Sequence, residues 1–179
     1  ALREAKRLGA RIVGITNAVN LIDGLDGLAS GISAIALLTF AVIAHQSNLN
    51  TVALLSLILV GAIFGFLRYN FYPAKIFLGD SGSMLLGFIT SGLSAYGIIN
   101  GASPYVLFIP ILVLGVPILD TFYAIIRRYL ERKPIFQADK KHIHHRLLNK
   151  GLSHRQAVLV IYGISLFLSA SALWVWSIL

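Results

Sequence analysis

Residues 17–31 read NAVNLIDGLDGLASG, which is the most informative segment of the chain. Two amides and two carboxylates, Asn17, Asn20, Asp23 and Asp26, lie here between apolar residues. On a helix, a spacing of three residues places such side chains in one stripe, and nearby glycines leave room for another helix or a ligand. An acid in an apolar segment is costly and commonly faces a polar cavity, so the stripe predicts a functional site. The alternative interpretation is a ladder of hydrogen bonds between helices.

The composition is that of a membrane protein. The chain has 179 residues, of which 57% are hydrophobic and only 12% charged, and its mean hydropathy is +0.80. Soluble domains carry roughly 25% charged residues. Cysteine is absent, which excludes disulfides and thiolate metal sites. We expect no cleavable signal peptide, because the basic segment 1–11 lacks the short apolar core of such peptides.

Apolar segments long enough to cross a bilayer recur along the chain. We predict an all-α polytopic membrane bundle that forms a single transmembrane domain over residues 1–179. It would have about five transmembrane helices, at 12–44, 51–70, 82–99, 104–126 and 157–179. We expect Pro110 and Pro117 to bend the fourth of them.

The basic residues predict the orientation of the bundle. Every Lys and Arg lies in the basic N-terminal segment 1–11, beside the link between the second and third spans, or in the polar loop 127–156. Five spans would place all of them on one side of the membrane. We therefore predict a multi-pass protein of the cell (plasma) membrane with this side facing the cytoplasm. The net charge of +8 therefore indicates topology and a lipid bilayer as partner, and we predict no nucleic-acid partner. The acids gather at the same face, which favours a cytoplasmic site over an ion-coupled transporter.

Residues 77–83, FLGDSGS, open the third span. Asp80 and Ser81 suit the N-cap or first turn of a helix, where free backbone N–H groups favour anions. A carboxylate at this position could instead hold Mg²⁺, which takes oxygen ligands and often shares them with phosphates. A plain N-cap is the third interpretation. Phe77 lies three residues before Asp80 and could stack on a base.

Residues 139–146, DKKHIHHR, combine a carboxylate with three cationic side chains and three imidazoles. We interpret this run as a phosphate-recognition motif, because Arg grips phosphate with two hydrogen bonds and His supplies a tunable charge. A zinc site and a basic loop on anionic lipid headgroups are the alternatives. We expect no role for the isolated His45 and His154, and assign none to Asp120.

Together these motifs resemble a known family. NAVNLIDGLDGLASG, FLGDSGSMLLG and PIFQADKKHIHHRLL resemble the polyprenyl-phosphate N-acetylhexosamine-1-phosphate transferases, from about Val13 onward. HIHHRLL is most similar to the bacterial undecaprenyl-phosphate N-acetylglucosamine-1-phosphate transferases. The resemblance implies transfer of N-acetylhexosamine-1-phosphate, GlcNAc-1-phosphate in particular, from a UDP-sugar to a membrane polyprenyl phosphate. This reaction releases UMP at the cytoplasmic face and serves cell wall biogenesis, including lipopolysaccharide or teichoic acid biosynthesis.

The resemblance also implies site residues, a metal and partners. Mg²⁺, with Mn²⁺ as an alternative, would bind Asp80 and Asn20, and these two residues together with Asp23 would serve catalysis. The UDP-N-acetylhexosamine would bind the remaining motif residues: Asn17, Asp26, Phe77, His142, His144, His145 and Arg146. Members of the family often pair, which makes a homodimer an expectation.

The chain departs from the family in one respect. Family members are about twice as long, and their N-terminal half carries an adjacent Asp-Asp pair, whereas this sequence contains no adjacent acidic pair. It resembles the C-terminal half only. The alternative function is therefore a non-catalytic membrane fragment that binds nucleotide-sugar, lipid or a partner subunit.

Overall fold

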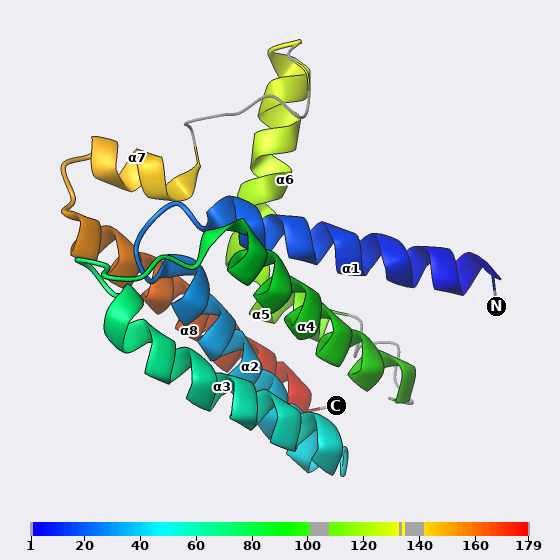
Figure 1. Cartoon of the computed structure of the whole chain (residues 1–179). Helices are drawn as coiled ribbons and strands as arrows, with labels where there is room; N and C mark the ends of the chain where they lie inside the picture. The colour runs from blue at the N-terminus through cyan, green and yellow to red at the C-terminus, as the bar shows by residue number, and fades with distance from the viewer. Residues whose placement is uncertain (1, 101–107, 133, 135–141, 179) are drawn as a thin grey trace.

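The structure, a computed structural model, describes residues 2–100, 108–132, 134 and 142–178. These residues form helices and no strands, which confirms the all-α prediction. Figure 1 shows the helices in chain order: α1 (Leu2–Ile22), α2 (Leu28–Gln46), α3 (Asn50–Asn70), α4 (Gly79–Asn100), α5 (Ile109–Val113), α6 (Gly115–Leu130), α7 (Ile143–Asn149) and α8 (His154–Ser177).

Helix α2 forms the centre of the bundle and contacts α3, α4 and α8. Within the described residues, three helices are long and apolar enough to cross a membrane: α2, which is 78% buried over its most apolar window, and α3 and α8, which are each 28% buried. The outer two expose large apolar side chains, such as Leu57 and Phe64 on α3 and Phe167 on α8. Apolar surface of this kind suits contact with lipid, so the polytopic membrane interpretation is consistent with the fold.

The first predicted span, 12–44, is not one helix. Helix α1 ends at Ile22, the break Asp23–Gly27 is not helical, and α2 begins at Leu28. Gly27 has a φ of 78°, a conformation that favours glycine. In Figure 1, α1 runs along the upper edge of the bundle in a different direction from α2, and its N-terminus projects to the right. The helical-stripe argument is therefore wrong for Asp23 and Asp26, because the helix stops before it reaches them.

The other spans are closer to the prediction. Helices α3, α4 and α8 cover the predicted spans 51–70, 82–99 and most of 157–179. The fourth, 104–126, is interrupted at Leu114, between Pro110 and Pro117 as expected, and its first residues lie outside the described part of the chain. Helix α6 then runs on to Leu130, inside the predicted polar loop 127–156, which also contains α7.

Candidate active site

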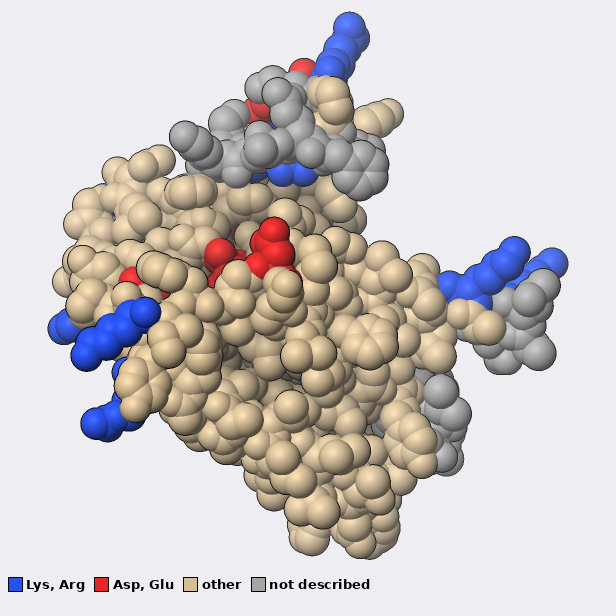
Figure 2. Space-filling model, in the orientation of Figure 1, with Lys and Arg blue, Asp and Glu red and all other residues tan. Residues whose placement is uncertain are grey.

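The candidate site is a cavity of about 310 Å³ where the α1–α2 break meets the segment that leads into α4. Figure 2 shows a group of acidic side chains near the middle of the drawn face, with further acidic atoms at the left and at the top, and most Lys and Arg at the margins. The cavity is lined by Asp23, Gly24, Leu25, Asp26, Asn70, Phe77, Leu78, Gly79 and Asp80. Two of the three sequence motifs, 60 residues apart, thus meet in one place.

Asn20 and Asp80 are in direct contact. The Nδ2 of Asn20 lies 3.1 Å from the Asp80 Oδ1 and 2.9 Å from the Ser83 Oγ. Asp80 occupies the first turn of α4, which confirms its predicted place at a helix start. Helices α1 and α4 come close at Gly87, where a Cβ would lie 2.8 Å from the Thr16 Cα. The missing side chain at Gly87 therefore lets the two helices bring the amide to the carboxylate.

The carboxylates of the break crowd each other. Burial and, to a lesser degree, the negative charges of Asp80 and Asp26 together raise the pKa of Asp23 from 3.8 to about 6. The Asp26 Oδ2 accepts a hydrogen bond of 3.0 Å from the backbone N–H of Ala74, so one oxygen of this carboxylate holds the segment before α4. The site as a whole is negatively charged and would gain from a bound cation.

The oxygen-rich residues fit a magnesium ion. No cluster of three or more His, Asp or Glu suited to a metal occurs among the described residues. Mg²⁺, however, is usually held by one or two carboxylates and completes its shell with water and substrate phosphates. Asp80, with Asn20 beside it, offers that smaller set, and a divalent cation would also offset the smaller, coulombic part of the rise in the pKa of Asp23, which comes from Asp80 and Asp26.

Helix α7 brings the histidine motif against the break. His144 is only 2% exposed, and a Cβ at Gly24 would collide with its imidazole. Burial and, to a lesser degree, the neighbouring His145 and His142 together lower the pKa of His144 from 6.5 to about 4, so the ring is neutral at pH 7. Its Nδ1 is buried and lacks a hydrogen-bond partner within the described residues. A buried polar atom without a partner suits a ligand that supplies one.

Of the remaining predicted residues, Phe77 lines the cavity and Asn17 and Arg146 do not. Phe77 lines it and is 73% exposed, open to a stacking partner. The Asn17 Nδ2 instead donates 2.9 Å back to the Val13 carbonyl, and the Arg146 guanidinium lies 5.6 Å from the Tyr123 ring centroid. Neither Asn17 nor Arg146 lines the cavity. Three motif residues, Asp139, Lys140 and Lys141, lie outside the described residues.

Sequence reasoning missed three residues that hold the site together. The His154 Nε2 accepts a 2.9 Å bond from the Asp26 backbone N–H, and its ring stacks on Tyr72 at 4.4 Å, so the expectation of no role was wrong. Asn70 is buried and joins the Ser30 hydroxyl to the Ile76 carbonyl. Asp120 binds the start of α7. Each is a polar residue within or beside an apolar helix, which is the signal that could have identified it.

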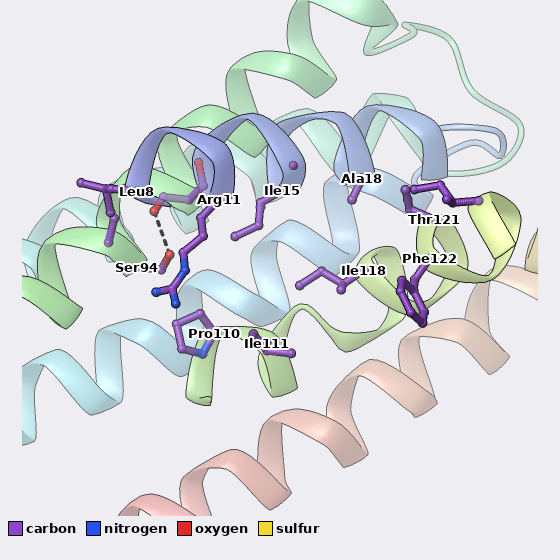
Figure 3. A pocket seen from close by; sticks show the side chains of 14 residues that line it. Leu8, Arg11, Ile15, Ala18, Ser94, Pro110, Ile111, Ile118, Thr121 and Phe122 are labelled. Atoms are coloured by element: carbon purple, nitrogen blue, oxygen red, sulfur yellow. Dashed lines mark hydrogen bonds between the residues drawn. The ribbon is translucent and has the colours of Figure 1, made fainter. Parts of the chain in front are cut away.

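A second, apolar cavity of about 280 Å³ lies among α1, α4, α5 and α6. In Figure 3, Leu8 and Ser94 lie toward one end, and Ala18, Thr121 and Phe122 toward the other. Ala18 is two residues from Asn20, and Thr121 follows Asp120 directly. The two cavities share no lining residue, and helix α1, which carries Asn20, contributes Ala18 to the apolar one.

Comparisons with known proteins agree with the motifs. The family model "Glycosyl transferase family 4" matches residues 9–98. A Bacillus subtilis protein named "Probable undecaprenyl-phosphate N-acetylglucosaminyl 1-phosphate transferase" is 55% identical over 162 residues, which are 90% of this chain and 45% of that protein. The decaprenyl-phosphate N-acetylglucosaminephosphotransferase of Mycobacterium tuberculosis is 42% identical, over 92% of this chain and 46% of its own length.

A third relative carries a different donor name. The phospho-N-acetylmuramoyl-pentapeptide-transferase of Desulforudis audaxviator is 39% identical over 90% of this chain and 47% of its own length. The chain thus spans about half the length of the curated relatives it matches. It resembles the named N-acetylglucosamine transferases more closely than this phospho-N-acetylmuramoyl-pentapeptide-transferase.

Proposed function

The chain belongs to glycosyl transferase family 4, and from this we propose that it transfers N-acetylglucosamine-1-phosphate from UDP-N-acetylglucosamine to a membrane polyprenyl phosphate. One observation carries the proposal: Asp23 and Asp80 line one cavity, Asn20 is hydrogen-bonded to Asp80, and His144 packs against Gly24 of the same cavity. The relatives' names supply the substrate class, and the site supplies groups suited to it.

The reaction is a phosphoryl transfer. An oxygen of the polyprenyl phosphate forms a bond to the sugar-side phosphorus of the UDP-sugar, the bond from that phosphorus to the bridging oxygen breaks, and UMP leaves with that oxygen. Catalysis of this kind depends mainly on positioning and on neutralising charge. Bound Mg²⁺ would neutralise the diphosphate charge, and Asp80 with Asn20 would hold it.

The chain's own residues would position the two substrates. Phe77, exposed beside the cavity, would stack on the uracil, and Asp26 would face the uridine. The imidazoles of α7 would contact the diphosphate and sugar. The apolar cavity of Figure 3 would take the first units of the polyprenyl chain, since apolar side chains line most of it. The distribution of Lys and Arg supports a site that faces the cytoplasm, where UDP-sugars are made.

The test is transfer by the 179-residue chain itself. We expect membranes that contain it to convert labelled UDP-N-acetylglucosamine and undecaprenyl phosphate into labelled lipid when Mg²⁺ is present. EDTA should abolish the product, and Asp80→Asn should lower turnover by about 100-fold or more, as losses of electrostatic stabilisation do. Asn50→Ala, at the opposite end of α3 from the site, is the control and should retain full turnover.

One outcome would replace the proposal with the alternative function. If the chain binds UDP-N-acetylglucosamine but forms no lipid product under any of these conditions, it is a binding fragment. Absence of both binding and turnover in folded protein would reject both functions.

A further inference from the structure

The Asp120 carboxylate is buried, and both its oxygens bind the start of α7. Asp120 and His142 have side chains that are 7% and 6% exposed. The Asp120 Oδ2 lies 2.8 Å from the His142 Nδ1, and the Oδ1 accepts a 2.9 Å bond from the Ile143 backbone N–H. His142, the N-cap residue of α7, makes no capping bond with its own side chain. A residue of α6 therefore caps α7 from outside.

This geometry determines which nitrogen of His142 carries the hydrogen. An ionised carboxylate is only an acceptor, so the imidazole must donate through Nδ1–H. The Nε2 is then the ring atom left to a ligand. Carboxylates that bind the far nitrogen of a functional histidine orient the ring and select its tautomer in the same way.

The imidazoles form a row that runs from Asp120 to the break. The rings of His142 and His144 are parallel within 3°, with centroids 5.9 Å apart. His144 contacts His145 at 4.3 Å and packs against Gly24. Asp120 thus holds His142 at one end of the row. Gly24, which has no side chain, leaves room for His144 at the break.

We propose that Asp120 is a positioning residue that holds His142 in the Nδ1–H tautomer and sets the place of the imidazole row against the donor site. The effect on donor handling rests on the function proposed above, whereas the tautomer and the place of α7 do not. Asp120 itself is not assigned a contact with substrate.

The variant Asp120→Asn separates the two contacts. Its amide oxygen can still accept the Ile143 N–H, but its NH₂ group then faces the His142 Nδ1 and requires an acceptor there. We expect α7 to remain capped while His142 changes to the Nε2–H tautomer. Nitrogen-15 spectra of histidine-labelled protein distinguish the tautomers, and His142→Gln identifies the signal.

The kinetic expectation follows from that change. Asp120→Asn should lower kcat for sugar-phosphate transfer by about 10-fold or more, the usual scale for an orienting carboxylate, and change the KM for UDP-N-acetylglucosamine much less. Leu119→Ala, the exposed neighbour on α6, is the matched control and should leave the tautomer and kcat unchanged.

A wild-type spectrum that shows the His142 hydrogen on Nε2 overturns the proposal. This test needs no variant, so the proposal can be rejected even if Asp120→Asn folds poorly. An Asp120→Asn protein with the wild-type tautomer, or with reversed tautomer and full kcat, overturns it too. If the wild-type chain transfers nothing, the proposed function fails, while the spectra still decide the role of Asp120.

Discussion

Asp23 and His144 have opposite pH dependences. The pKa of Asp23 is raised from 3.8 to about 6, so the folded state binds its proton more tightly than the unfolded state does. This contribution makes stability fall as pH rises through that interval. The pKa of His144 is lowered from 6.5 to about 4, so the unfolded state binds that proton more tightly and stability rises with pH. The two groups therefore change the stability in opposite directions over nearly the same pH range.

Removing either group should therefore reveal the other. In metal-free detergent solution, we expect wild-type Tm to change little between pH 4 and pH 6 from these two groups. The Tm of the Asp23→Asn variant should rise with pH over this range. The Tm of the His144→Gln variant should fall with pH. For each variant, the free energy of unfolding should change by about 1 kcal/mol over this pH range, since solvent screening reduces the full effect of such a pKa shift. Parallel pH profiles for the two variants would contradict this account; Asn17→Ala should behave as wild type.

The α1–α2 break is the element that places the site. Gly24 and Gly27 interrupt the apolar run, and contacts from distant segments occupy the backbone and side chains of the break: the Asp26 N–H binds His154, and the Gly27 carbonyl accepts the Tyr162 hydroxyl. A continuous helix would carry Asp23 and Asp26 away from this cavity. The break therefore sets the geometry of the carboxylates.

We expect Gly27→Ala to destabilise the break. Its φ of 78° costs other residues about 1–2 kcal/mol, and the new Cβ would lie 3.1 Å from the Phe71 ring. Gly61→Ala is the matched control: it lies inside α3, a Cβ there meets nothing within 4 Å, and alanine favours the helix by about 1 kcal/mol. Chemical unfolding should show a loss for Gly27→Ala alone; equal stability of both variants would show that the break tolerates a side chain.

At the scale of the whole molecule, the distribution of Lys and Arg predicts orientation. The turn between α2 and α3 carries neither residue type in segment 45–50, whereas the α7 end of the molecule carries several. On the positive-inside rule, we therefore expect the site to face the cytoplasm. The absence of cysteine from the chain makes single-cysteine labelling a direct test.

We expect Gln46→Cys to react with a membrane-impermeant maleimide in intact cells, and Lys150→Cys to react only after the membrane is opened. Both positions are exposed, so burial does not explain a difference between them. The reverse labelling pattern would place the site outside the cell and reject the use of cytoplasmic UDP-sugars. The cysteine-free wild type is the background control.

The sequence by itself determined the helical membrane character and the three polar motifs, since apolar runs of bilayer length and clustered polar groups are local properties of the chain. It also carried the family, because motif residues keep their order and spacing whatever the geometry. Only the tertiary structure decided that α1 stops at Ile22, that His144 packs against Gly24, and that Asp120 and His154 support the site. Those features depend on contacts between residues about 20 to 130 positions apart. The 3.6-residue period of a helix predicts only which neighbouring residues share a face, so it does not predict such contacts.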